Sequence, residues 1–318
     1  MTTDTARPST ATHIQTISRH LAHRCAVSEV FVTSLHADSP DSYTVGAQLP
    51  RMHAYYGDHL GPAATLYDPL LVMEAARQAA IALTHEYFDV PHDRAFVVRT
   101  FNGTATDSAA WQIGPVPADL IMEVEITARH ERHGRTHGVD MVLDIDCGGT
   151  PMMTVDGSFT WVTPRQWDQL RGSSRAGLGL GEFDGTTVPG ERAEPATVGR
   201  GNRRNVVIGP LRFHSAGGAA ALVADTGHPF LFDHPLDHAP GSLLIEAARQ
   251  AAAALLGPDT SRLFSVASTF EKFVELDHPA ECVAEIIQTD PARIRCDIYQ
   301  CGSVTTRIDL EFTEATYP

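Results

Sequence analysis

The segment EAARQAA occurs twice, at residues 74–80 and at residues 246–252. Each copy lies between apolar runs, LLVM (70–73) and IAL (81–83) around the first, LLI (243–245) and AALL (253–256) around the second. An Asp-His pair precedes each copy, at 58–59 and 233–234, and FVVRTF (96–101) and FSVASTF (264–270) follow. The copies lie 172 residues apart, which is too long for a solenoid repeat. The chain is therefore predicted to contain a duplicated domain.

Length, charge and cysteine usage limit the class of protein. A chain of 318 residues predicts two domains, and 43% hydrophobic with 20% charged residues is globular composition. The net charge of −15 disfavours binding to nucleic acid or to anionic membranes. The five cysteines have no zinc-ligand spacing and are odd in number, which favours a reducing compartment. No apolar stretch reaches the roughly 18 residues of a membrane span. We expect a soluble cytoplasmic protein.

Two long buried helices are predicted around the repeated segments. Asp68 is a good N-cap, Pro69 suits the first helical position, and about 20 residues follow without a breaker. The second helix is expected to begin near Gly241-Ser242 and to stop at Gly257-Pro258. Both helices are apolar almost all round, so other elements must wrap them.

Alternating segments after each helix predict the wrapping strands. They span residues 120–130, 139–146 and 154–162 in the first half, and 294–298 and 304–312 in the second. A strand, a long helix and antiparallel strands, repeated twice, are typical of an α+β double hotdog, in which two tandem hotdog domains form an intramolecular pseudo-dimer. We expect a loose segment at 1–27, hotdog domains at 28–163 and 205–318, and a linker rich in Gly, Pro and Ser at 164–204.

Three polar residues recur inside each apolar helix. Glu74, Arg77 and Gln78 share a helix face, as do their counterparts Glu246, Arg249 and Gln250. A buried carboxylate must find a partner or raise its pKa, and both outcomes suit a catalytic acid or base. The alternative is a partly solvated pair worth about 0.2–0.5 kcal/mol. Two occurrences at matching places favour a functional site.

Histidines in the loop ahead of each helix form a second group. His228, His234 and His238 precede Glu246, and a His and a Glu in one cleft make an acid/base pair. Loop histidines that cap the helix or turn the chain are an equally weighted alternative, and the spacings do not favour a metal site. The first half has His53 and His59 before a longer loop, so the two sites are not expected to be equivalent. No GxSxG elbow or activated cysteine is present, which leaves direct acid/base catalysis without a cofactor.

Several motifs resemble a known family. LPRMHAYYGDHL (49–60), DPLLVMEAARQA (68–79) and DHAPGSLLIEAARQ (237–250) are similar to the two-copy pattern of the A-factor biosynthesis (AfsA-like) family. The resemblance implies transfer of a β-ketoacyl group from an acyl carrier protein thioester to the hydroxyl of dihydroxyacetone phosphate. The products would lead to γ-butyrolactone, butenolide or furan autoregulators. His234 and Glu246 also match the catalytic positions of hotdog β-hydroxyacyl-carrier-protein dehydratases.

The same resemblance assigns site residues. The family's functional residues fall on Glu74, Glu246 and Arg249. As a hypothesis, Glu246 or His234 accepts the hydroxyl proton, while backbone N–H groups at a helix start such as Gly241 polarise the thioester carbonyl. Arg249, Arg77, Arg203 or Arg204 would hold the substrate phosphate. His59 and Gln250 complete the set of candidate substrate-binding residues.

Two other functions remain open. One is a hotdog dehydratase or thioesterase of acyl thioesters, and the other is a non-catalytic binder of a lipid-like signal. An acidic carrier protein would need a local basic surface, for which residues 200–204 are the better candidate and residues 129–135 are more simply a solvated turn. The chain would act as a monomer with its internal pseudo-dimer or as a homodimer.

Overall fold

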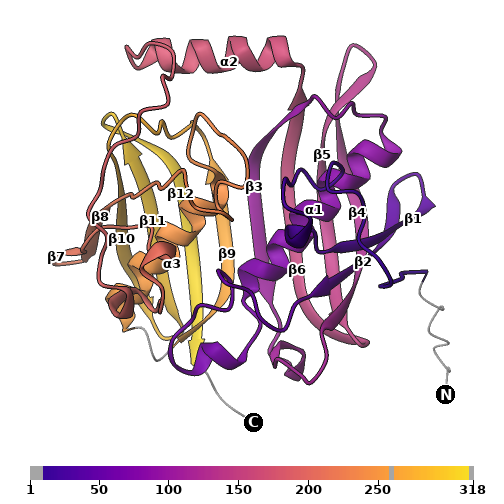
Figure 1. The fold of residues 1–318 in the computed structure, drawn as a ribbon, viewed down its shortest axis with the longest axis horizontal. Helices are drawn as coiled ribbons and strands as arrows, with labels where there is room; N and C mark the ends of the chain where they lie inside the picture. Colours follow the sequence, from indigo (N-terminus) through magenta and orange to yellow (C-terminus); the bar gives the residue numbers. More distant parts are fainter. Residues whose placement is uncertain (1–9, 258–260, 315–318) are drawn as a thin grey trace.

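One continuous antiparallel sheet organises the molecule. The computed structural model describes residues 10–257 and 261–314, and within these ranges twelve strands join in the order β1-β2-β4-β5-β6-β3-β9-β12-β11-β10-β8-β7 (Figure 1). The strands of the first half are β1 (Val32–Ser39), β2 (Ser42–Leu49), β3 (Ala95–Ala105), β4 (Ala118–Arg132), β5 (Arg135–Cys147) and β6 (Thr150–Val162). Those of the second half are β7 (Arg212–His214), β8 (Gly217–Ala221), β9 (Ser261–Phe270), β10 (Ala280–Thr289), β11 (Ala292–Gln300) and β12 (Ser303–Glu314).

The two halves have the same strand order about the centre of the sheet. Outward from the centre, the first half runs β3-β6-β5-β4-β2-β1 and the second runs β9-β12-β11-β10-β8-β7. They meet where β3 pairs with β9, with Thr100 opposite Thr269 and Thr104 opposite Ser265. The predicted double hotdog and its intramolecular pseudo-dimer are confirmed.

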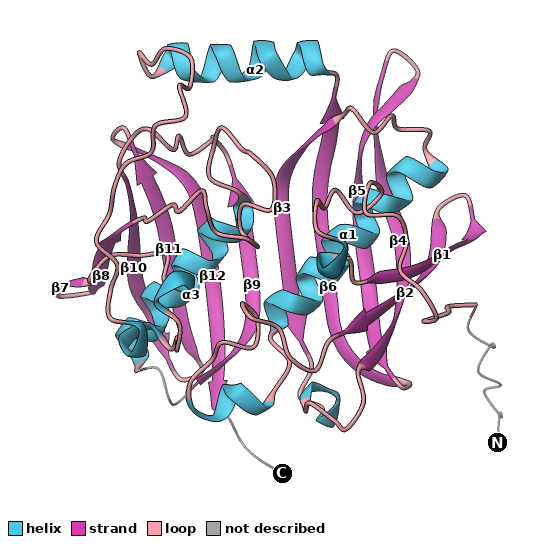
Figure 2. Ribbon diagram, viewed as in Figure 1, coloured by secondary structure: helices cyan, strands magenta, loops and turns pink. Residues whose placement is uncertain are grey.

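A long helix lies against the sheet in each half. Helices α1 (Pro69–Tyr87) and α3 (Gly241–Leu256) both lie on the viewer's side of the sheet (Figures 1 and 2). The Asp68 side chain accepts the Leu70 N–H at 2.9 Å and so caps α1, as its sequence predicts. Ala75, Ala76 and Ala79 are fully buried, because small side chains let helix and sheet approach closely.

The described part of the segment before β1 contacts the rest of the fold, although its polar sequence suggested a loose segment. From residue 10 onward it is ordered, and Ile17 N–H donates to the Val32 carbonyl at 3.0 Å. Residues 19–31, called here the first strap, carry Arg24 into a buried ion pair with Glu74 at 2.5 Å. The sequence does not reveal this contact, because a single arginine in a polar segment gives no sign that its partner lies 50 residues away inside a helix.

The linker prediction missed an ordered helix. Helix α2 (Pro164–Gly177) starts with a capping box between Thr163 and Gln166 and lies across one end of the sheet (Figure 1). Arg171 and Arg175 bind the buried Glu275 carboxylate at 2.7 and 2.6 Å and so fasten α2 to the second half. The segment connects the two halves as expected, and the domain boundaries around it stay a prediction. No helix in the described residues is long and apolar enough to cross a membrane.

Candidate active site

Glu74 lies at the centre of a buried hydrogen-bond network on α1. Its carboxylate accepts from Arg24 Nε at 3.1 Å, from Arg77 Nε at 2.8 Å and from Gln78 Nε2 at 2.8 Å. Arg24 also stacks over the Phe230 ring, 4.7 Å from its centroid, and donates to the Phe230 carbonyl at 3.3 Å. The first strap thus joins a helix of the first half to a loop of the second.

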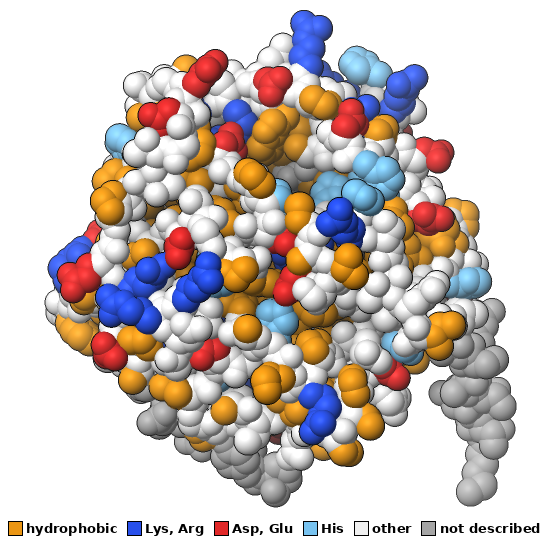
Figure 3. Space-filling view, in the orientation of Figure 1, with side chains coloured by type: hydrophobic (Ala, Val, Ile, Leu, Met, Phe, Trp, Pro, Cys, Tyr) orange, Lys and Arg blue, Asp and Glu red, His pale blue; other side chains and the backbone are white. Residues whose placement is uncertain are grey.

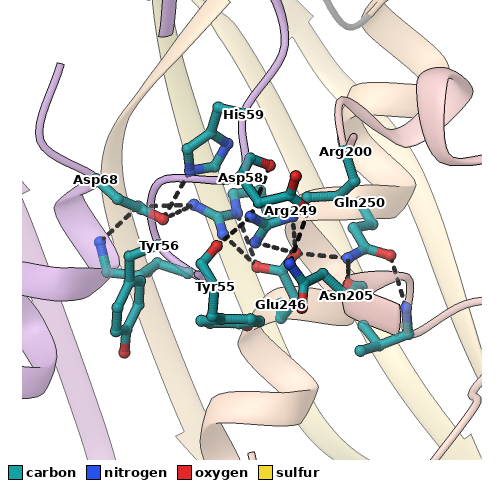
Figure 4. Close-up of polar contacts among 12 residues, drawn as sticks. Tyr55, Tyr56, Asp58, His59, Asp68, Arg200, Asn205, Glu246, Arg249 and Gln250 are labelled. Carbon is teal, nitrogen blue, oxygen red and sulfur yellow. Dashed lines mark hydrogen bonds and ion pairs between the residues drawn. The ribbon is translucent and has the colours of Figure 1, made fainter. Parts of the chain in front are cut away.

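Glu246 on α3 has the corresponding partners. It accepts from Arg200 Nε at 3.0 Å, from Arg249 Nε at 2.9 Å and from Gln250 Nε2 at 2.6 Å (Figure 4). Arg200 donates in turn to the Tyr55 carbonyl of the first half at 2.8 Å. Residues 195–207, the second strap, therefore repeat the role of the first with the halves exchanged.

Each helix glutamine holds its strap as a neighbouring strand would. Gln78 donates to the Glu29 carbonyl at 2.8 Å and accepts the Phe31 N–H at 2.9 Å. Gln250 does the same with the Asn205 carbonyl and the Val207 N–H, at 2.7 and 2.9 Å. The Glu-Arg-Gln triplet consequently fixes a strap to a buried helix in both halves.

Both helix carboxylates are ionised. Burial alone would raise their pKa values, but Arg24 and Arg77 outweigh burial and lower the pKa of Glu74 to about 2. Arg200 and Arg249 likewise hold the pKa of Glu246 below its usual range. Of the two outcomes expected from sequence, partnership is confirmed and a raised pKa is wrong. A carboxylate paired in this way is a poor proton acceptor and orients its arginines instead.

A cavity of about 520 Å³ opens beside Glu74. The charged and titratable part of its wall includes His23, Arg24, Glu74, Arg77 and Asp156 of the first half and Asp233, His234 and His238 of the second, and Gly241 lies beside them. Its remaining wall is mainly apolar and includes Met73, Ile81, Val98, Leu143, Phe159 and Phe270. Histidine side chains gather beside hydrophobic ones toward the upper centre of the face shown in Figure 3. An elongated apolar ligand with one polar end fits such a wall.

His234 is a titratable group in the wall of this cavity, and no ion pair of the described residues involves it. Burial lowers the pKa of His234, the nearby Asp233 carboxylate opposes this shift, and the positive charges of Arg24 and Arg77 add to it. The imidazole is therefore neutral at pH 7 and able to accept a proton. The neighbouring Asp233 accepts the N–H groups of Cys25 and Ala26, at 2.5 and 3.1 Å, and so holds the first strap against the His234 loop.

The corresponding place in the other half is almost filled. Its cavity has a volume of only about 70 Å³ and is lined by His59, Asp68 and Arg249 among others. The buried Asp68 carboxylate lies 2.7 Å from Arg249 Nη1 and 2.8 Å from His59 Nε2 (Figure 4). Although burial opposes ionisation, Arg249 and His59 lower the pKa of Asp68 far below its usual range. An internal ion pair thus takes up the space that the first cavity leaves open.

The structure separates the residues predicted from sequence into groups. Glu74, Arg77, His234 and Gly241 line the large cavity, while His59 and Arg249 line the small one. Glu246 and Gln250 lie in the buried network behind Arg249, and Arg203 and Arg204 line neither cavity. Among the described residues, no group of three or more His, Cys, Asp or Glu side chains is placed to hold a metal ion.

Sequence analysis missed the strap arginines and the pairing of Asp68 with Arg249. Arg24 and Arg200 each stand seven residues before the residue whose N–H binds the helix glutamine, Phe31 and Val207. Apart from the arginine and one valine, however, the two straps share no identical residue at matching places. An upstream extension of the repeat would have identified these arginines only from two identical residues at matching places, which is a weak signal.

The architecture is that of a tandem hotdog protein. It is similar to an oleoyl thioesterase (putative) from Lactobacillus plantarum, with a TM-score of 0.54, 10% identity, and coverage of 89% of this chain and 100% of that one. At that identity the likeness establishes the fold alone.

The family follows from the sequence profile of the A-factor biosynthesis (AfsA) hotdog domain, which matches residues 5–163 and 185–301. This chain belongs to the A-factor biosynthesis hotdog family, as its motifs implied. A relative from Streptomyces virginiae, named 2-oxo-3-(phosphooxy)propyl 3-oxoalkanoate synthase, is 34% identical over 85% of this chain and 87% of its own length. A relative of the same name from Streptomyces coelicolor is 30% identical over 89% of this chain and 87% of its own length.

Proposed function

We propose that this chain is an acyltransferase that joins a 3-oxoacyl group to the hydroxyl of dihydroxyacetone phosphate, at the cavity beside Glu74. The name of the relatives describes an ester between a 3-oxoalkanoate and a 2-oxo-3-(phosphooxy)propyl group. The observation that carries the proposal is the cavity itself, which joins an apolar wall to His234 and two arginines. Such a wall suits an acyl chain, and its polar end suits a phosphorylated acceptor.

The reaction is an exchange of a thioester for an ester. The acceptor hydroxyl oxygen attacks the thioester carbonyl carbon, the new C–O bond forms and the C–S bond breaks. His234 takes the hydroxyl proton and returns it to the leaving thiolate, so the products are the ester and a free thiol. This assignment favours His234 over Glu246 as the base, because Glu246 lies outside the large cavity and is bound by two arginines and a glutamine.

The other residues at the polar end act on charge and orientation. Glu74 holds Arg24 and Arg77 in place and serves as a positioning residue. The first turn of α3, beginning at Gly241, lines the large cavity, and the backbone N–H groups and positive dipole end of a helix start suit a bound anion. The acyl donor is a carrier-bound thioester in this proposal. Arg203 and Arg204, exposed on the second strap, are candidates for docking an acidic carrier protein.

The decisive assay supplies purified protein with a β-ketoacyl thioester and dihydroxyacetone phosphate and identifies the product by mass spectrometry. We expect the ester together with free thiol. His234→Gln should reduce the rate by about 10²-fold or more, the usual contribution of a general base. His36→Gln is the matched control, because His36 lies in β1 and lines neither cavity. Acid release without the acceptor would support a thioesterase instead, and tight lactone binding without turnover would support a sensor.

A further inference from the structure

The small and the large cavity, called here the two half-sites, contain the same set of three hydrogen-bond donors. In the small one, a single carboxylate is bound by all three. In the small cavity, Asp68 binds three donors, which are the Leu70 N–H at the start of α1, Arg249 Nη1 and His59 Nε2. The pattern amounts to an anion site that the chain fills with its own side chain. The repeat identifies the residues at the equivalent place in the large cavity.

The counterparts follow from the repeat. Asp68 stands six residues before Glu74, and Pro240 stands six residues before Glu246, so a proline replaces the carboxylate. The matching donors are the Ser242 N–H, Arg77 and His234. All three residues line the large cavity. Pro240 supplies no side-chain cap to α3, whereas Asp68 caps α1.

Arg77 and Arg249 bind their helix glutamates with the same two nitrogens and differ only at Nη1. Arg249 holds Glu246 with Nε and Nη2 and gives Nη1 to Asp68. Arg77 holds Glu74 with Nε and Nη2, and no acceptor for its Nη1 lies among the described residues. The Arg77 side chain is 32% exposed, compared with 9% for Arg249. The free nitrogen of Arg77 corresponds to the one that Asp68 occupies in the other half.

We propose that the phosphate of the acceptor binds in the large cavity where Asp68 lies in the small one, between Arg77 Nη1, the first turn of α3 and His234. This inference rests on the proposed function for the identity of the ligand. A phosphate monoester suits the place because it carries permanent charge and several acceptor oxygens, and a helix start with an arginine is suited to bind it. The thioester oxyanion, in contrast, exists only during the reaction.

This placement of the phosphate also positions the acceptor hydroxyl for the reaction. With the phosphate held beside His234, the acceptor hydroxyl three carbons away lies within the same polar end of the cavity. Once His234 has taken the proton, its positive charge is balanced by the phosphate, as His59 pairs with Asp68 at 2.8 Å.

The test is to place the missing carboxylate into the large cavity. Pro240→Asp should cap α3, pair with Arg77 and close the anion site, and Pro240→Asn is the matched control because Asn caps a helix equally well without charge. Inorganic phosphate is the probe, and thermal unfolding is the readout, since a ligand that binds the folded state raises the melting temperature. We expect phosphate to stabilise the wild type and the Asn variant and to have lost its effect on the Asp variant.

Turnover provides a second readout. Pro240→Asp should raise the KM for dihydroxyacetone phosphate by about 10- to 100-fold, the range for losing a charge-assisted interaction, while Pro240→Asn stays within a few-fold. If Pro240→Asp does not fold, Arg77→Gln replaces it and should weaken phosphate binding while leaving thioester binding unchanged. Equal phosphate stabilisation in the wild type and the Asp variant, or none in the wild type, would overturn the inference. If phosphate stabilises the wild type but not Pro240→Asp, and the wild type makes no ester, the anion site is supported and the proposed function is refuted.

Discussion

Replacing Asp68 by asparagine tests whether the small half-site is structural. Asn keeps the N-cap of α1 and the size of the side chain, so the substitution removes only the charge that faces Arg249 and His59. Both partners are buried, with Asp68 fully enclosed and Arg249 bound 2.7 Å from it. Removing one member of a buried ion pair costs about 3–5 kcal/mol. Here Arg249 Nε and Nη2 keep Glu246, but Arg249 Nη1 loses the charge of Asp68 without regaining water.

The cost converts into a shift of the melting temperature. At roughly 2.1 cal/mol/K per residue, unfolding of 318 residues carries an entropy of about 0.67 kcal/mol/K. The two halves share one sheet, so we expect them to unfold together. Asp68→Asn should then lower the melting temperature by about 4 to 8 °C. The rate per folded molecule should stay close to that of the wild type, since Asp68 lies outside the large cavity.

Calorimetry or circular dichroism measures the shift, and ester formation at a temperature well below the transition measures the rate. Asp41→Asn is the matched control, because it removes the same charge from an exposed pair with Arg129 and should cost about 1 °C or less. A shift below 1 °C in Asp68→Asn, or a rate that falls with the stability retained, would refute a structural role for this carboxylate.

Three further predictions concern the large half-site. The pKa of Glu74 is lowered to about 2, so its stabilising contribution should be complete above the unfolded value of roughly 4.3 and vanish as the pH falls toward 2. Glu74→Gln should therefore flatten the dependence of melting temperature on pH between those values, and an unchanged slope would contradict the pairing. Arg24→Met should release the first strap, and hydrogen exchange should then speed up over residues 19–31 while it stays unchanged in β11. Because the pKa of His234 is lowered, the rate should rise with pH to a plateau whose midpoint lies below 6.5, and a midpoint above that value would exclude His234 as the base.

The helices and most central strands could be predicted from the sequence, because their signals are local. Asp68 and Pro69 mark the start of α1, Gly257 follows the end of α3, and the alternation from Leu120 to Ile126 gives the inward face of β4. The repeated EAARQAA predicted the duplication, and the candidate site at its two Glu-Arg-Gln triplets stays a prediction. Periodicity and helix capping depend on residues a few positions apart, so both can be recognised in a single sequence.

The difference between the two half-sites depends on contacts across the fold. Arg77 and Arg249 stand in identical heptapeptides, and only the tertiary structure places Asp68 against Arg249 and brings Pro240 into the wall of the cavity that Arg77 lines. The partners Asp68 and Arg249 are 181 residues apart, and the straps reach their glutamates over 50 and 46 residues. The sequence by itself determined that two long helices carry the same Glu-Arg-Gln triplet. Only folding decided which site is filled by its own carboxylate and which stays open, because a charge is matched by whatever neighbour the chain brings within hydrogen-bond distance.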